Sequence, residues 1–438
     1  MWPIRGSWGR CRRIGTLLLA AGVSLWAGCQ EKRPPASAPA SSASEPPPRR
    51  DALVGGPFPT LLVVQAQFQR KPNALGKLEA VPGYAKTVLV RRTQRGWEPV
   101  TIEDPDSKVF HRVMPYDLDG KGMGFLTLGG TQASLKFWRF ADGAWTQQTL
   151  WNPRFGGQWD RLRDLEIGDV TGDGRPEMVV ATHDQGVVAV LQRDGERWRA
   201  RELDRQPRVF VHEIEIGDVD GDGRNEFFAT PSSPNQATLV SQPGQIVMYK
   251  HDGGGFTRTV VDAPEGTHAK EILVLDAAGT GRPTLFAAVE ARTEMRDGRL
   301  ERLAPVQIKE YRFAPEGITS RVVATLDDRQ CRFLSPGDVD GDGRTDIVAT
   351  GMESGVWLLR RQDDGTWTPT VIDRDSSGFE HAALVADLEG DGRPEVYVAS
   401  DRQKELRRYV WRGDRFEKEV LLALSGDEIT FNLAAGRF

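Results

Sequence analysis

The sequence predicts an all-β fold: a seven-bladed β-propeller of four-stranded antiparallel blades. The first observation behind this prediction is a repeated acidic segment, which reads "GDVTGDGRPE" from Gly168, "GDVDGDGRNE" from Gly217, "GDVDGDGRTD" from Gly337 and "ADLEGDGRPE" from Ala386. The second is the text between these segments, where short β-rich runs alternate with Gly and Asp turns and show no helical periodicity. Four strands per repeat of this length form one propeller blade.

Two degenerate copies, "YDLDGKGMGF" from Tyr116 and "LDAAGTGRPT" from Leu275, bring the acidic segments to six. Their first aspartates are residues 117, 169, 218, 276, 338 and 387, spaced by 52, 49, 58, 62 and 49 residues. A second feature occurs seven times: a turn followed by an aromatic or aliphatic residue that opens the last strand of a repeat. We expect these residues to pack between blades; they are Trp97, Trp145, Trp198, Phe256, Ile318, Trp367 and Phe416.

The two ends of the chain explain why seven repeats carry only six acidic segments. Residues 60–67, 84–93 and 97–103 are predicted to be the last three strands of a blade that lacks its first strand. The C-terminal segment Glu428–Gly436 is predicted to be a first strand without the other three. One blade built from both termini would close the ring and hide the sheet edges that an open sheet exposes. An open solenoid is the competing architecture.

The N-terminus is typical of an export signal. A basic stretch that ends at Arg13 precedes an apolar run, Ile14–Ala27, which is too short to span a bilayer but suits the core of a signal peptide. The following "LWAGC" resembles a bacterial lipobox, in which the cysteine, here Cys29, is lipidated and becomes the first mature residue. The alternative is an ordinary signal peptide with an incidental cysteine. Residues 29–57, rich in Pro, Ser and Ala, are predicted to be a disordered tether, and residues 58–438 the propeller.

The charge balance argues against nucleic acid as a partner. The chain has 57 Lys and Arg against 62 Asp and Glu, a formal charge of −5. Without residues 1–28, which hold four arginines and no acidic residue, 53 basic residues face 62 acidic ones, a net charge of −9. Phosphate binding requires a concentrated basic face, which this composition does not favour.

The acidic segments predict calcium sites. Calcium prefers six to eight oxygen ligands, which a short loop supplies at alternate positions. In "DVDGDGRNE", side chains offer oxygens at positions 1, 3, 5 and 9 and a backbone carbonyl at position 7, while Gly221 and Gly223 allow the tight turn. About four structural calcium ions are therefore expected. The alternative is that the loops are plain turns stabilised by Asx hydrogen bonds.

The expected calcium ligands fall in four loops. They are Asp169, Thr171, Asp173, Arg175 and Glu177; Asp218, Asp220, Asp222, Arg224 and Glu226; Asp338, Asp340, Asp342, Arg344 and Asp346; and Asp387, Glu389, Asp391, Arg393 and Glu395. The first of these loops should bind more weakly because Thr171 stands at position 3. Two loops are expected to be metal-free because other residues replace their acids. The loop that begins at 117 has Lys121 and Phe125, and the loop that begins at 276 has Ala278, Thr280 and Thr284.

With these loops, residues 58–438 resemble the FG-GAP/VCBS repeat propellers, which include the N-terminal propeller of integrin α subunits. The resemblance implies the propeller fold and calcium in the loops. It says little about function, because the fold hosts adhesion modules, lectins and lyases alike.

A ligand site is predicted at the opposite end of the central channel. Six residues before each first aspartate stand basic or protonatable side chains: His111, Arg163, His212, Lys270, Arg332 and His381, with His268 two residues before Lys270. Trp151 and Trp159, in a nearby loop, are candidate aromatic platforms. Such a ring would suit an acidic carbohydrate, and its affinity should rise as the histidines titrate near pH 6 to 7. The alternative is that these side chains only neutralise Asp164, Glu213 and Glu271, which follow them directly.

Three functions fit these patterns. The leading hypothesis is a calcium-stabilised binding or scaffolding module for a glycan or protein ligand, monomeric, exported, and lipid-anchored to a bacterial membrane at the outer membrane or cell surface. The second is a polysaccharide lyase that acts on an acidic glycan at the channel mouth. The third is a structural partner in an envelope assembly. No G-x-S-x-G or H-E-x-x-H motif is found.

Overall fold

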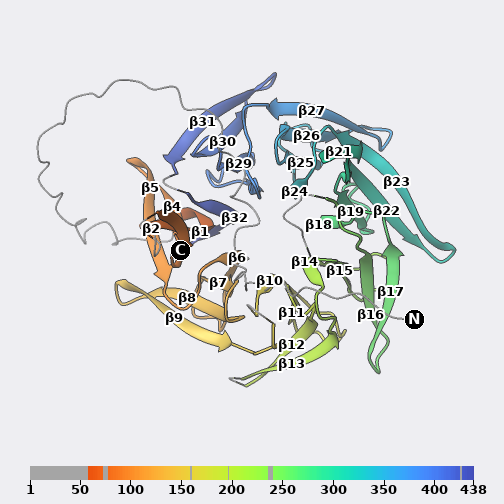
Figure 1. The fold of residues 1–438 in the computed structure, drawn as a ribbon, viewed down its shortest axis with the longest axis horizontal. Helices are drawn as coiled ribbons and strands as arrows, with labels where there is room; N and C mark the ends of the chain where they lie inside the picture. Colours follow the sequence, from red (N-terminus) through yellow and green to blue (C-terminus); the bar gives the residue numbers. More distant parts are fainter. Residues whose placement is uncertain (1–57, 73–76, 158–159, 196, 235–239, 425–426) are drawn as a thin grey trace, which may run out of the picture.

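The computed structural model describes residues 58–72, 77–157, 160–195, 197–234, 240–424 and 427–438. The predicted signal peptide, Cys29 and the tether lie outside these residues. Within them, seven four-stranded antiparallel sheets stand around a central axis (Figure 1), as the repeat predicts. No helix of the described part is long and apolar enough to cross a membrane.

Each blade is numbered here from the first complete repeat, with its strands given from the axis outward. Blade 1 comprises β6 (Phe110–Tyr116), β7 (Gly124–Gly129), β8 (Leu135–Ala141) and β9 (Ala144–Trp151). Blade 2 comprises β10 (Leu162–Gly168), β11 (Glu177–Thr182), β12 (Val188–Asp194) and β13 (Arg197–Asp204). Blade 3 comprises β14 (Phe210–Gly217), β15 (Glu226–Ser232), β16 (Ile246–His251) and β17 (Phe256–Asp262).

Blade 4 comprises β18 (Ala269–Leu275), β19 (Thr284–Val289), β22 (Val306–Ala314) and β23 (Gly317–Leu326). Blade 5 comprises β24 (Cys331–Gly337), β25 (Asp346–Gly351), β26 (Gly355–Arg361) and β27 (Trp367–Asp373). Blade 6 comprises β28 (Ala383–Ala386), β29 (Glu395–Ser400), β30 (Glu405–Trp411) and β31 (Phe416–Ala423).

Blade 7 is built from both ends of the chain, which confirms the predicted closure. Its innermost strand is β32 (Ile429–Arg437), which pairs with β1 (Pro59–Ala66); β4 (Ala85–Thr93) and β5 (Gly96–Asp104) complete the sheet. Figure 1 shows β32 beside β1, next to β6 of blade 1. Two connections between second and third strands form extra hairpins, β2 (Phe68–Pro72) with β3 (Leu78–Pro82) and β20 (Arg292–Arg296) with β21 (Arg299–Ala304).

The core lies between blades rather than within them. Successive residues of a strand point to opposite faces of a sheet, so Val179 packs toward blade 3 and Val180 toward blade 1. Seven clusters of this kind fill the seven seams, and the one that contains Leu89 and Phe125 joins blade 7 to blade 1. The glycine before the acidic loop is needed for this packing, because a Cβ on Gly337 would lie 2.4 Å from Val385 of the next blade.

Six of the seven residues predicted to open the outer strands pack in these seams, and one does not. Trp97, Trp145, Trp198, Phe256, Trp367 and Phe416 contact the buried clusters. Ile318 is 37% exposed instead. Phe313, which pairs with it across the hairpin, packs in the seam between blades 3 and 4.

Candidate functional site

The innermost strand of each blade places two groups of side chains at opposite ends of the channel. The acidic loop follows the end of this strand and leads into the second strand, as Gly217 pairing with Glu226 shows. The predicted basic ring lies at the start of the same strands, six residues earlier, or about 20 Å away along an extended chain. The two groups are therefore separate sites.

The first aspartate organises every acidic loop as a turn. Asp218 accepts hydrogen bonds from the amides of Gly221 (2.7 Å) and Gly223 (2.8 Å), and Asp169 and Asp387 accept equivalent ones. Asp338 accepts from the amides of Asp342 (3.0 Å) and Gly343 (2.9 Å). The two degenerate loops do the same, since Asp117 accepts from the amide of Gly120 at 2.9 Å and Asp276 from the amide of Thr280 at 3.0 Å. The turn itself therefore requires no cation, and the acids at positions 3, 5 and 9 distinguish a cation site from a plain turn.

In two loops the acids converge as cation ligands would. Asp218, Asp220 and Glu226, and likewise Asp338, Asp340 and Asp346, each bring three carboxylate oxygens within 4.8 Å of one another. The Oδ2 atom of Asp346 is buried without a hydrogen-bond partner. Burial, and then the nearby Asp340 charge, raises the pKa of Asp346 to about 7. A buried carboxylate oxygen without a donor fits a hard cation such as calcium.

The corresponding oxygen in the 218 loop has an ion pair but no hydrogen bond. Glu226 is fully buried, and its Oε1 lies 3.0 Å from the Lys250 ammonium without hydrogen-bond geometry. Burial raises the pKa of Glu226, and Lys250 opposes this shift. The 218 and 338 loops therefore both fit a divalent cation, although their protein counter-ions differ.

The 169 and 387 loops satisfy their acids with protein donors. Glu177 accepts from the Val170 amide (3.1 Å), the Thr171 hydroxyl (3.1 Å) and the Gln192 amide (3.2 Å). Glu389 pairs with Arg92 at 3.2 Å and Arg408 at 3.0 Å, and Arg408 also reaches Glu395.

The position 5 aspartates, by contrast, behave alike in all four loops. Asp173, Asp222, Asp342 and Asp391 each accept from the amide two residues on, at Arg175, Arg224, Arg344 and Arg393.

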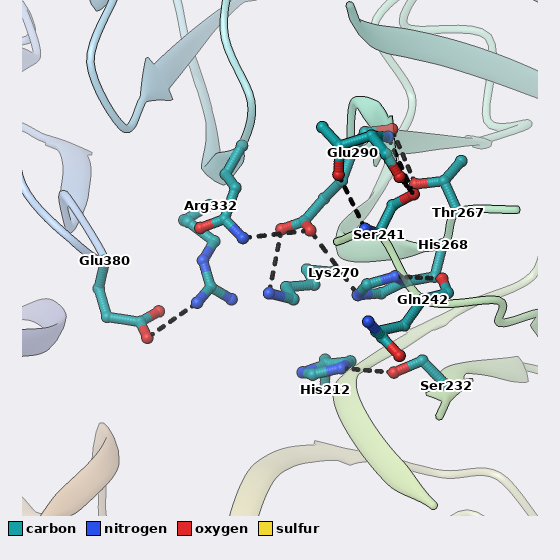
Figure 2. Close-up of polar contacts among 12 residues, drawn as sticks. His212, Ser232, Ser241, Gln242, Thr267, His268, Lys270, Glu290, Arg332 and Glu380 are labelled. Carbon is teal, nitrogen blue, oxygen red and sulfur yellow. Dashed lines mark hydrogen bonds and ion pairs between the residues drawn. The ribbon is translucent and has the colours of Figure 1, made fainter. Parts of the chain in front are cut away.

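At the other end of the channel, the cations of the predicted ring are buried and ion-paired. Arg163 Nη2 lies 3.5 Å from Glu213 and 3.8 Å from Glu380, and Arg332 lies 3.1 Å from Glu380. Lys270 lies 3.2 Å from Glu290 (Figure 2). Burial, and then the Arg332 charge, lowers the pKa of Lys270 to about 8. Each of these three cations thus has an acidic partner, and the ring is not a free cationic surface.

The ring histidines are buried and neutral. His111 Nδ1 donates to the Leu162 carbonyl (2.6 Å), and His268 Nδ1 to the Gln242 carbonyl (2.8 Å). His212 bonds Ser232 at 2.9 Å and stacks on His268 with ring centroids 5.4 Å apart (Figure 2). Desolvation lowers the pKa of each, to about 4 for His268. They therefore stay uncharged near pH 6 to 7, contrary to the titration expected from the sequence.

His381 leaves the predicted register altogether. It precedes β28 in a left-handed conformation with φ 54°. Its Nδ1 donates to the Gly351 carbonyl (2.6 Å), and its Nε2 accepts from Ser376 (2.8 Å). The short innermost strand of blade 6 therefore leaves this histidine between the end of β25 and the loop that contains Ser376.

Of the two predicted aromatic platforms, only Trp151 is described. It is half-buried, packs edge-on against Phe155 at 5.7 Å, and contacts the core between blades 1 and 2. Trp159 lies outside the described residues.

A family model for the FG-GAP-like repeat matches residues 169–229 and 338–398. Each matched segment starts at the first aspartate of one acidic loop and contains the next loop. The protein is a seven-bladed β-propeller that carries FG-GAP-like repeats. No curated protein is significantly similar to it in sequence.

Solved structures share the fold of this FG-GAP propeller at low identity. An Agrocybe aegerita lectin that recognises non-reducing terminal N-acetylglucosamine is 16% identical, with a TM-score of 0.52 over 87% of this chain and 95% of the lectin. A Lactobacillus plantarum protein is 11% identical, with a TM-score of 0.54 over 86% and 99%. At these identities the likeness concerns the fold alone.

The sequence interpretation missed three members of the channel network of this FG-GAP propeller. His183, whose ring lies 5.1 Å from His212, follows the second strand of blade 2, and Glu290 follows that of blade 4. Both stand fourteen residues after the first aspartate of their repeat, at 169 and 276, so the register of the second strand would have found them. Glu380, in a loop before β28, has no such regularity.

Aromatic and polar side chains that precede the buried ring by two residues form the rim of the channel in four blades. Eight residues before the first aspartate stand Arg161, Phe210, Gln330 and Phe379, all partly exposed, whereas blade 1 has Val109 and blade 4 the buried His268 at this position. Phe210 stacks on His183 at 4.3 Å, and Phe379 lies under the Arg332 guanidinium at 5.4 Å. The buried network beneath fixes the orientation of these rim groups. An FG-GAP propeller of this kind is suited to a binding or scaffolding role.

Proposed function

We propose that this protein is a calcium-stabilised binding module of the bacterial cell envelope, which holds a glycan at the rim of its channel. The propeller would be exported as a monomer and anchored by lipid at Cys29, with residues 29–57 as the tether. The N-terminal basic and apolar segments and the "LWAGC" motif support the export and the anchor.

The observation that carries the proposed ligand site is the rim described above. Sugar rings offer an apolar face and several hydroxyl groups, so they suit partly exposed aromatic rings flanked by oriented polar groups. Phe210 and Phe379 supply the rings. The Gln330 amide nitrogen donates to Glu290 at 3.3 Å, and the amide oxygen of Gln330 is a buried acceptor without a hydrogen-bond partner.

Charge favours a neutral glycan over the acidic one expected from the sequence. Arg163, Lys270 and Arg332 are ion-paired with Glu213, Glu290 and Glu380, so each of these cations already has an acidic partner. An acidic ligand would gain little from cations that already have partners at these distances. A propeller of similar fold recognises terminal N-acetylglucosamine, which makes this sugar the first neutral probe.

Calcium would act as a structural cross-link in this proposal. The side chains of Asp218, Asp220 and Glu226, and of Asp338, Asp340 and Asp346, would hold the ions. A bound ion supplies positive charge to buried carboxylates and ties the first strand of a blade to the second. These loops lie at the far end of the channel from the rim, so the ions would not contact the glycan.

The lyase alternative has less support. Proton abstraction requires a base within hydrogen-bond reach of the substrate. The candidate side chains His111, Arg163, His212, His268, Arg332 and His381 are all at most 8% exposed. Their polar atoms are directed to partners within the protein rather than to the rim.

Glycan binding can be tested on the full propeller with immobilised neutral and uronate-containing sugars. We expect the neutral panel, including terminal N-acetylglucosamine, to bind, and F210A and Q330A to weaken this binding at least about tenfold through lost stacking and a lost hydrogen bond. M123A is the control, because Met123 is 45% exposed in the degenerate acidic loop of blade 1, at the far end of the channel.

Three results would contradict the proposal. Equal binding by F210A, Q330A and the parent would place the ligand elsewhere. Binding only to uronate-containing sugars would refute the neutral ligand. New unsaturated sugar ends, read by absorbance, would indicate the lyase instead.

A further inference from the structure

Two acidic loops with nearly the same sequence differ in the cation that the protein itself supplies. In the 218 loop, the Lys250 ammonium lies 2.7 Å from Asp222 and 3.0 Å from Glu226, and it also contacts Asp220. Lys250 belongs to β16, the third strand of the same blade. One ammonium group thus stands among three carboxylates of a single loop.

The 338 loop has no such central cation. Arg360 of β26, the third strand of blade 5, reaches only Asp340, with Nε 2.6 Å from Oδ2. Arg344 pairs with Asp342 and turns outward to Asp363 at 2.6 Å. Asp346 is fully buried, and its Oδ2 keeps no hydrogen-bond partner.

We propose that Lys250 is a tethered competitor of the divalent cation in the 218 loop, so that calcium fills the 338 loop first and enters the 218 loop only by displacing the ammonium. This inference rests on the proposed calcium binding. The competitor also stabilises the empty 218 loop, because it neutralises carboxylates that would otherwise repel one another. The empty 338 loop lacks this protection at Asp346.

The physical basis is that a second positive charge a few ångströms from a bound divalent ion opposes its binding. At a partly exposed site the cost of one such charge is of the order of a tenfold change in affinity. Blade 2 provides the neutral counterpart, since Gln192 of β12 donates to Glu177 at 3.2 Å from the third strand. The substitution K250Q therefore copies an arrangement that this chain already uses.

Calorimetric titration of chelator-treated protein with calcium tests the inference. We expect the parent to show a tighter and a weaker class of sites, and K250Q to lower the Kd of the weaker class about tenfold. K71Q is the matched control, because it removes the same charge from the exposed β2 strand, and it should bind as the parent does. Adding D218N to K250Q should abolish the gain in calcium affinity, because this gain arises in the 218 loop.

Thermal unfolding of the same variants supplies an independent readout. Without calcium, K250Q should melt below K71Q, and with saturating calcium the difference should disappear. K250T, neutral and compatible with a strand, replaces K250Q if the latter does not fold.

The possible outcomes separate this inference from the proposed function. Equal calcium affinity of K250Q and the parent would overturn the competitor role, as would a gain that persists with D218N. Binding by K250Q but not by the parent would support the competitor and refute calcium stabilisation of the natural protein. Binding by neither would refute both.

Discussion

Buried histidines couple the stability of this propeller to pH. His381 is fully buried, with Nδ1 donating to Gly351 and Nε2 accepting from Ser376, so both ring nitrogens are used in the neutral form. Desolvation lowers its pKa from 6.5 to about 4. Because the pKa of His381 is lower in the folded than in the unfolded chain, its contribution to the free energy of unfolding is complete above about pH 6.5 and is lost as the pH falls toward 4.

We expect H381N to reduce the loss of stability that the propeller suffers at acidic pH. The parent should lose about 3 kcal/mol of unfolding free energy through this residue between pH 7 and 4, because protonation must occur in the unfolded chain. Asn tolerates the left-handed backbone and cannot titrate in this range. Denaturant unfolding in excess calcium at several pH values measures the effect, and H251N is the control. Parallel pH curves for H381N and the parent would contradict the prediction.

The limits of the sequence interpretation are clearest in the ion pairs at the residue scale. Arg163 and Lys270 occupy the same position in two different repeats, and this register was visible in the sequence. Their partners come from elsewhere: Glu380 belongs to a loop of blade 6, more than two hundred residues from Arg163. Lys250 reaches the 218 loop from a strand that follows a long connection. The first pairing depends on the closed ring and the second on the pairing of β16 with β15 after that connection, and a local sequence pattern encodes neither.

At the scale of elements, side chains on the innermost strands join each blade to the next. Asp164 accepts from the Ile214 amide at 2.7 Å, Glu215 from Val274 at 3.0 Å and Glu271 from Leu334 at 3.0 Å. The innermost strands of blades 1 to 5 carry a register shift near their start, which leaves amides without a partner in their own sheet. These acids therefore connect one blade to the next. The sequence alone predicts only that such acids are neutralised by the basic residues beside them.

We expect D164A to destabilise the propeller more than D164N does. Asp164 is 1% exposed, so D164A leaves the buried Ile214 amide without an acceptor and removes one partner of Arg112, at a cost of about 3 kcal/mol. The amide oxygen of Asn can still accept from Ile214, and Arg112 keeps Glu166. Equal denaturation midpoints for the two variants would show that the connector hydrogen bond contributes nothing.

The strands themselves were predictable to within a few residues, for a physical reason. Each acidic loop fixes the ends of two strands, and each outer turn fixes the ends of two more, so the repeat defines a blade almost completely. Prediction failed where a blade departs from the repeat. In blade 4, Phe313 packs in the seam instead of Ile318, and the innermost strand of blade 6 begins only at Ala383.

For the whole molecule, ring closure depends on the last eleven residues of the chain. β32 pairs along its length with β1, and Leu433 and Ala434 are buried in the two seams beside blade 7. Phe438 packs on Phe125 and Trp145 of blade 1. Without this strand, blade 7 would expose the edge of β1, and both seams would lose apolar contacts.

A chain that ends at Asp427 should therefore lose its cooperative thermal transition or aggregate, because an open, apolar sheet edge is a template for association. A synthetic peptide with the sequence of residues 428–438 should restore the transition, since the missing strand can pair with β1 from outside the chain. L433A is the matched control: it keeps the strand and should cost only about 2 to 5 kcal/mol. A truncated chain that melts like the parent would mean that the other six blades hold the ring without closure. Rescue by a scrambled peptide would mean that register along β1 is not required.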